Sequence, residues 1–367
     1  MLYLLPHQWS IDMKRQKRYD FTVFIARMQP YHSGHEHIIK TALERSETLI
    51  IGIGSANSSI RPMNPWDYEQ RKEMIVASLT PKERAHVSII SLNDHTYNND
   101  GWITEARKKI EIIIGWKIGN TGNIDDSSVA LIGHDKDHTS FYLKLFPMWD
   151  NIPVDAIHHE GRIIHASDIR EYMFGADIRT IHSKLIPEGA YQWLRDYTST
   201  PEFDYMMGEY EYIRHNKAKW TTAPYDVNHM TADAVVTQSA HVLLVKRRSR
   251  PGKGLYSLPG GFVNNNEMVV DAALRELREE TRLKVSPNVL RKSIINVKQY
   301  DNPRRSERGR IVTSAYHIAL EDQGQGLPKV RGSEETEKAF WQPLCRLDAT
   351  QLFEDHYHII RDLTGTA

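Results

Sequence analysis

Short apolar runs alternate with helical stretches through the first half of the chain. Residues 21–25 and 48–54 are rich in β-branched and aromatic side chains, and residues 36–45 between them favour a helix. Residues 129–132 form a third run of the same kind. A strand, a helix and a second strand in this order predict a βαβ unit of a buried parallel sheet, whose ligands bind at the carboxyl ends of the strands.

The second half of the chain shows a different pattern. Residues 232–237 and 241–247 are predicted strands joined by a turn, and residues 255–262 lead to a helix. We expect this helix to begin at Asn266 as its N-cap and to end near Leu283. Later runs predict further strands, at residues 294–299, 311–320 and 338–344.

Two breaks separate these halves, at residues 198–201 and 221–224, and each contains a proline. With 367 residues the chain is long enough for about two domains. We predict a flexible tail at residues 1–19, a first domain at 20–200, a helical connector at 201–226 and a second domain at 227–367.

Composition excludes several partner classes. Lys plus Arg and Asp plus Glu are equal at 47 each, so no global field attracts nucleic acid or an acidic membrane. The apolar runs are far shorter than the ~20 residues of a membrane span. Cys345 is the single cysteine of the sequence, which suits a reducing compartment. We therefore expect a cytoplasmic protein with no nucleic-acid or membrane partner, while a homo-oligomer stays open.

The predicted helix of the second half carries three acidic residues. Glu276, Glu279 and Glu280 are spaced i, i+3, i+4 and project from one face. Carboxylates crowded in this way repel one another unless a hard cation neutralises them, and oxygen ligands suit Mg²⁺ or Mn²⁺. The alternative is a solvated acidic face balanced by Arg275 and Arg278.

The spacing around these carboxylates resembles the Nudix box, the signature of hydrolases that cleave nucleoside diphosphates linked to another group. Gly261 is followed by five residues, Glu267, seven residues and then the sequence Arg-Glu-Leu-Arg-Glu-Glu at 275–280. The resemblance implies that the Gly261 carbonyl, Glu276, Glu279 and Glu280 bind divalent ions, with Glu276 and Glu279 as catalytic residues, and that Arg275 and Glu267 brace the helix. Arg282 stands where the box normally has glycine, at an estimated cost of ~1 kcal/mol.

A phosphate-binding loop is predicted after the first strand. Gly34 allows close backbone approach, and the helix that follows offers unpaired N–H groups to an anion. His32 and His35 add imidazole donors three residues apart. The alternatives are a zinc pair, for which no Cys or acidic partner lies nearby in the sequence, and two surface histidines.

The motif His-x-Gly-His resembles that of the nucleotidylyltransferase superfamily, and its flanks resemble archaeal-type nicotinamide mononucleotide (NMN) adenylyltransferases. The resemblance makes His32 and His35 catalytic. It also implies substrate-binding residues, namely Arg27, Gln29, Gly34, Asn64, Arg71, Asn98, Trp102, Gly133, Lys136 and Asp137. Trp102 would stack on the cationic nicotinamide ring, a contact typically worth ~1–2 kcal/mol. A core aromatic on an amphipathic helix is the alternative for Trp102, and a solvated ion pair is the alternative for Lys136 and Asp137.

Residues 164–173 resemble the second signature of that superfamily, whose hydroxyls and arginine hold the ATP β- and γ-phosphates. Ile164, Ile169 and Arg170 match, and Ser167 keeps a hydroxyl, which makes Arg170 a catalytic and Ser167 a binding candidate. The middle of the signature departs from the pattern, since the two common serines are absent. An ordinary helix capped by Ser167 remains the alternative.

Two further loops bear on the second site. Residues 301–310 hold four arginines, and we predict that Arg304 and Arg305 clamp a diphosphate or terminal ribose, with a disordered basic loop as the alternative. The general base varies in the Nudix family, and Glu334, Glu335 and Glu337 are candidates.

Together the resemblances predict a bifunctional α/β protein: an N-terminal Rossmann-like nucleotidylyltransferase domain with a parallel sheet and a C-terminal α/β/α Nudix domain with a mixed sheet. The implied reactions are formation of NAD and pyrophosphate from NMN and ATP, and Mg²⁺-dependent hydrolysis of ADP-ribose to AMP and ribose 5-phosphate. One alternative is an adenylyltransferase for another phosphate, joined to a broader nucleoside-diphosphate-sugar hydrolase. The other is a Nudix domain that only senses ADP-ribose.

Overall fold

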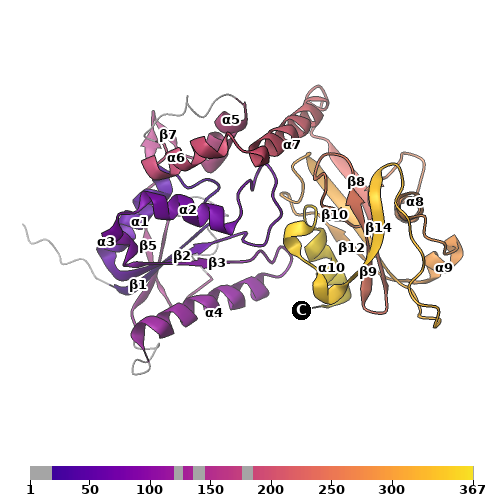
Figure 1. The fold of residues 1–367 in the computed structure, drawn as a ribbon, viewed down its shortest axis with the longest axis horizontal. Helices are drawn as coiled ribbons and strands as arrows, with labels where there is room; N and C mark the ends of the chain where they lie inside the picture. Colours follow the sequence, from indigo (N-terminus) through magenta and orange to yellow (C-terminus); the bar gives the residue numbers. More distant parts are fainter. Residues whose placement is uncertain (1–18, 120–126, 135–144, 176–184, 367) are drawn as a thin grey trace, which may run out of the picture.

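The computed structural model describes residues 19–119, 127–134, 145–175 and 185–366. It contains a five-stranded sheet, a seven-stranded sheet and a small two-stranded hairpin (Figure 1). The first is parallel, with five strands in the order β3-β2-β1-β4-β5. Its strands are β1 (Tyr19–Ala26), β2 (Ser46–Ile53), β3 (Val87–Ser91), β4 (Val129–Gly133) and β5 (Asp150–Pro153). This confirms the predicted Rossmann-like domain with a parallel sheet.

Helices cover both faces of this sheet because its strands are apolar on both sides. Phe24 and Ile51 pack into a core that includes residues of α1, α2, α5 and α6, while Val23 and Ile50 pack against α4 on the opposite face. The helices and the small hairpin are α1 (Ser33–Arg45), α2 (Tyr68–Ser78), α3 (Pro81–Arg84), α4 (Asn99–Ile118), β6 (His158–His159), β7 (Arg162–Ile163), α5 (Ala166–Gly175) and α6 (Glu188–Tyr197).

Helix α7 (Pro201–Ala218) lies between the two sheets in the sequence. Thr200 caps it by accepting a hydrogen bond from the Phe203 N–H. No helix among the described residues is long and apolar enough to cross a membrane.

The second sheet is mixed, as predicted, and has seven strands. Its main path is β10-β9-β8-β13-β12, with β11 paired to β8 and β14 paired to β9. Only the β8–β13 pair is parallel. The strands are β8 (Asn228–Gln238), β9 (His241–Arg247), β10 (Tyr256–Ser257), β11 (Gly260–Phe262), β12 (Ile294–Tyr300), β13 (Arg310–Ala319) and β14 (Thr336–Pro343).

Alternating side chains of β8 and β9 bury both faces of this sheet. Val235 and Leu244 pack toward α10, whereas Val236 and Leu243 pack toward α8. The helices are α8 (Val269–Thr281), α9 (Pro287–Lys292), α10 (His356–Thr364) and two short 3₁₀ turns at Leu344–Arg346 and Ala349–Gln351.

Helix α10 faces the first domain (Figure 1). Tyr97, which follows β3, packs against the core of the second domain and donates a hydrogen bond to Asp355 at the start of α10. Asp355 also forms a buried ion pair with Arg305. The two domains are therefore joined by a polar network as well as by the chain.

Candidate active sites

The turn after β1 carries the two predicted histidines at the N-terminus of α1. His32 is the N-cap, and its Nδ1 accepts the Gly34 N–H at 3.1 Å. The His35 Nδ1 accepts the His32 N–H at 3.3 Å, and the two ring centroids are 3.8 Å apart. A neutral imidazole that accepts at Nδ1 carries its proton on Nε2. Both rings can therefore donate from Nε2 to an anion beside the helix N-terminus.

Arg170 reaches the same turn from α5. One of its guanidinium nitrogens donates to the Gln29 carbonyl, which places Arg170 beside the β1–α1 loop. Burial and, to a smaller extent, neighbouring Arg27 lower the pKa of Arg170 to about 10, whereas Glu307 of the second domain opposes the shift. Arg27 is solvent-exposed at the end of β1. The arrangement gathers positive charge where a polyphosphate could bind.

Three residues that were predicted to contact substrate form hydrogen bonds within the loops of this site. The Gln29 amide donates to Asn64 at 2.5 Å and to the Trp66 carbonyl at 2.7 Å. Arg71 is fully buried and donates to four backbone carbonyls, including those of Arg27 and Gly54. A guanidinium saturated in this way holds loops in place, so the predicted contacts of Gln29, Asn64 and Arg71 with substrate find no support here.

The other residues that were predicted to bind substrate in the first site lie in several different elements. Asn98 caps α4 by accepting the Gly101 N–H at 2.9 Å, and Trp102 lies half-buried in the first turn of that helix. Gly133 ends β4 within the sheet. Ser167 lies inside the first turn of α5, which excludes the alternative of a helix cap at this residue. Its hydroxyl donates to Asp168 at 3.3 Å, and its role in binding substrate stays a prediction. Lys136 and Asp137 lie outside the described residues.

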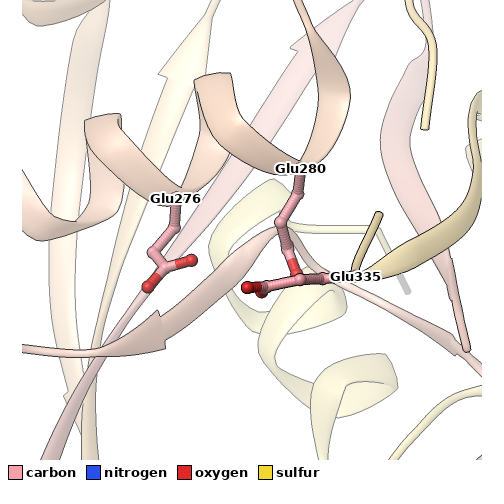
Figure 2. A group of neighbouring side chains, drawn as sticks. All are labelled: Glu276, Glu280 and Glu335. Carbon is pink, nitrogen blue, oxygen red and sulfur yellow. The ribbon is translucent and has the colours of Figure 1, made fainter. Parts of the chain in front are cut away.

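The second site contains a carboxylate cluster. Glu276, Glu280 and Glu335 each offer a carboxylate oxygen, and these atoms all lie within 4.8 Å of one another. Figure 2 shows Glu276 and Glu280 projecting from the same side of α8 toward Glu335, which precedes β14. Of the three general-base candidates, Glu335 lies in this cluster, whereas Glu337 pairs with Lys246 at 2.9 Å.

The electrostatics of this cluster fit a divalent cation. Burial, with a smaller contribution from the neighbouring Glu276 and Glu335, raises the pKa of Glu280 to about 8, although the Gly260 N–H and Arg247 oppose the shift. Burial likewise raises the pKa of Glu276. Buried carboxylates that repel one another are stabilised by a divalent cation, and their oxygen atoms are the ligands that Mg²⁺ or Mn²⁺ prefers.

Gly261 allows the cluster to form. A Cβ atom built on Gly261 would lie 2.3 Å from Oε1 of Glu276, so the carboxylate would have to move away from its present position. The missing side chain thus lets the Glu276 carboxylate approach strand β11, where the Gly261 carbonyl was predicted to be a metal ligand.

Arg275 and Glu267 brace the helix as predicted. Arg275 donates two hydrogen bonds to Glu267, at 3.0 and 2.7 Å, and also contacts Glu276 and Glu279. This pairing lowers the pKa of Glu267 to about 2. Glu279 is exposed and lies outside the three-carboxylate cluster, so its role as a ligand stays a prediction.

The ends of α8 differ in part from expectation. The helix begins at Val269 with Met268 as N-cap, so the predicted Asn266 cap is wrong. The reason is that residues 264–267 form a turn, held by the Asn264 N–H on Glu267. Arg282 does adopt the left-handed conformation expected at the helix end, with φ 52°.

The arginine loop does not bring Arg305 to the carboxylates. Arg305 is buried, and its guanidinium donates two hydrogen bonds to Asp355, at 3.0 and 2.9 Å. Its predicted role in clamping substrate therefore finds no support in these contacts. Arg304 is exposed on the same loop, near Arg27 of the first domain.

A cluster of aromatic residues that sequence reasoning missed surrounds Phe262 of β11. The ring centroids of Trp220 and His229 are 4.8 Å apart, and those of His229 and Phe262 are 5.8 Å apart. Phe262 directly follows Gly261, and Cζ of Arg308 lies 5.7 Å from its ring centroid. Trp220 and Phe262 are about half exposed. These residues are far apart in the sequence, so no sequence pattern predicted that they would lie together.

Comparison with known proteins finds a separate family for each domain. A cytidylyltransferase-like family model matches residues 23–140, and a NUDIX domain model matches residues 227–363. A nicotinamide/nicotinic acid mononucleotide adenylyltransferase of Acinetobacter baylyi is 31% identical over 193 residues, which are 53% of this chain and 94% of that protein. An ADP-ribose pyrophosphatase of Methanocaldococcus jannaschii is 34% identical over 133 residues, 36% of this chain and 71% of that protein.

The likeness to one solved structure extends over both domains. A bifunctional NMN adenylyltransferase/ADP ribose pyrophosphatase of Francisella tularensis, complexed with AMP and a manganese ion, superposes with a TM-score of 0.84 at 31% identity. The match covers 95% of this chain and 99% of that one.

Proposed function

The chain belongs to the family of bifunctional NMN adenylyltransferase/ADP-ribose pyrophosphatases, and we propose that each domain performs one of these reactions. The first joins NMN to the adenylyl group of ATP and releases pyrophosphate, giving NAD. The second adds water across the diphosphate of ADP-ribose, giving AMP and ribose 5-phosphate. The observation that supports the proposal is that a histidine-capped helix N-terminus and a carboxylate cluster lie in separate domains of a chain whose relative has both activities by name.

In the first site, catalysis follows from positioning and charge. The NMN phosphate attacks the α-phosphorus of ATP, and pyrophosphate leaves from the opposite side. His32 and His35 donate from Nε2 at the helix N-terminus, and Arg170 adds a guanidinium, so that negative charge growing on the triphosphate is stabilised. Removing one such donor typically raises the activation free energy by ~3 kcal/mol.

In the second site, Glu276, Glu280 and Glu335, with the Gly261 carbonyl, would hold Mg²⁺ or Mn²⁺. A bound divalent ion polarises a diphosphate and lowers the pKa of a water ligand. Arg275 keeps Glu276 in place by a 2.8 Å hydrogen bond. The rings of Trp220 and Phe262 offer exposed faces on which an adenine base can stack.

Two paired measurements test the assignment. Glu276→Gln should abolish AMP release from ADP-ribose and leave NAD formation unchanged, whereas Glu337→Gln, outside the cluster, should affect neither. Trp102→Ala should raise the KM for NMN roughly tenfold, the loss of one ring–cation contact. Wild-type protein that forms neither product, or a Glu276→Gln variant with full hydrolase activity, would refute the proposal. The cytoplasmic location also stays our proposal, based on the single cysteine.

A further inference from the structure

The arginine loop of the second domain contacts the first domain beside its nucleotide site. This loop, residues 301–309, joins β12 to β13. Arg61, which follows β2, donates from Nη1 to the Arg305 carbonyl at 3.3 Å. The Arg61 side chain also lies 4.0 Å from the Glu307 carboxylate. Segments that follow strands of a parallel sheet line its ligand-binding edge, so the loop reaches this edge from outside the domain.

A second contact fixes the position of the loop. Arg305 pairs with Asp355, which accepts a hydrogen bond from the Tyr97 hydroxyl. Tyr97 follows β3, the neighbour of β2 in the first sheet. The loop is thus attached to segments that follow two adjacent strands, and this attachment limits the positions that its exposed residues can take.

Some arginines at this contact between the domains have a carboxylate as partner, and Arg304 has none among the described residues. Glu307 lies close enough to Arg61 and Arg170 to affect both, and these arginines oppose the rise in its pKa that burial causes. Arg304 has no such partner, because its side chain forms no hydrogen bond or ion pair with the described part of the chain. Arg304 is exposed beside Arg305, whose carbonyl accepts from Arg61 of the first domain. Desolvation by the surrounding loops lowers the pKa of Arg27, although part of its side chain stays exposed, and the charge of Arg304 lowers it further.

Asp94, the carboxylate that opposes this repulsion, also accepts hydrogen bonds from the protein. Asp94 raises the pKa of Arg27, but its two oxygens accept hydrogen bonds from Ser55 at 3.0 Å and Ser58 at 2.8 Å. Two guanidinium groups held near each other are destabilised by repulsion, which a bound anion would relieve. Guanidinium also matches the geometry of phosphate oxygens better than any other side chain.

We propose that Arg304 of the second domain is a substrate-binding residue of the adenylyltransferase site, where it contacts a phosphate of ATP or NMN together with Arg27. The inference rests on the proposed function of the first domain. It assigns Arg304 to NAD formation rather than to the hydrolysis of ADP-ribose, and it makes the second domain part of the first domain's binding site.

The test compares Arg304→Ala, Arg304→Lys and Arg310→Ala in the full chain. Arg310 begins β13 directly after the loop and donates to the Asp301 carbonyl at the loop's start, so its removal reports on general disturbance of the loop. For each variant, KM and kcat are measured for ATP at saturating NMN and for NMN at saturating ATP. ADP-ribose hydrolysis by the same preparation serves as the folding control.

Arg304→Ala should raise the KM of one substrate about tenfold, the low end for a hydrogen bond between charged groups, with kcat within about twofold of wild type. The substrate affected identifies the phosphate, and Arg304→Lys should restore part of the affinity because the charge remains. Hydrolysis should not change.

Unchanged KM values for both substrates would overturn the proposal, and so would an equal rise with Arg310→Ala or an equal loss of both activities. If the wild type forms NAD, these results remove only the role of Arg304. If it forms none, the function proposed for the first domain fails and this inference fails with it.

Discussion

For the buried ion pair between Arg305 and Asp355, we expect that removing one partner lowers stability far more than replacing both partners with apolar residues. The side chains of Arg305 and Asp355 are only 2% and 5% exposed. Burial alone would raise the pKa of Asp355, but Arg305, with help from His356 and Tyr97, outweighs burial and lowers it. Asp355→Ala therefore leaves a buried guanidinium without its partner.

The expected cost of Asp355→Ala is about 3–5 kcal/mol, the range for removing one partner of a buried ion pair. For a domain of this size each kcal/mol corresponds to roughly 4 °C, so the unfolding transition of the second domain should move down by roughly 12–20 °C. The triple variant Tyr97→Phe/Arg305→Met/Asp355→Leu removes every charged member of the network and the hydroxyl that donates to it. Its stability should lie within a few kcal/mol of wild type, on either side.

Differential scanning calorimetry of the full chain measures these shifts, because two domains can give two transitions and a single unfolding free energy is not defined for both. Asp301→Ala is the matched control, since its side chain is 64% exposed and its ion pair with Arg310 should contribute little. A shift below roughly 3 °C for Asp355→Ala, or a triple variant less stable than Asp355→Ala, would show that the pair is not the buried, desolvated contact described here.

Three further perturbations address the second domain. Trp220→Ala should raise the KM for ADP-ribose roughly tenfold through lost base stacking while NAD formation stays constant; an unchanged KM would remove the aromatic cluster from the site. Gly261→Ala should weaken Mn²⁺ binding at least about tenfold, because the new methyl group meets the Glu276 carboxylate; titration of Mn²⁺ followed by electron paramagnetic resonance measures this, and wild-type affinity would contradict it. Burial lowers the pKa of His356, so the folded state binds fewer protons than the unfolded state below pH ~6.5, and stability should fall as the pH drops from neutral. His356→Asn keeps an acceptor for the Leu258 N–H and should reduce that slope by up to about 1.4 kcal/mol per pH unit; an unchanged slope of unfolding free energy against pH would exclude His356 as the cause.

The sequence predicted what depends on local spacing. The periodicity of apolar residues located β1, α1 and β2, since a buried parallel strand needs both of its faces apolar. The spacing of Glu276 and Glu280 fixed their common side of α8, because a helix determines that geometry by itself. The start of α8 was misplaced because Glu267, which lies outside the helix, holds the preceding turn through Asn264.

The arginines show why the remainder could not be read from sequence. Arg71 and Arg27 both lie in segments that match the adenylyltransferase pattern, yet Arg71 is saturated by four carbonyls while Arg27 stays exposed at the end of β1. Arg304 and Arg305 are adjacent, yet Arg304 is exposed and its charge acts on Arg27, whereas Arg305 is buried against Asp355. A guanidinium whose donors are used by the protein stabilises a loop, and one without a protein partner is available to a phosphate. The distinction depends on which carbonyls and carboxylates the fold brings near, and for Arg304 and Arg305 these belong to contacts between two domains that no local pattern encodes.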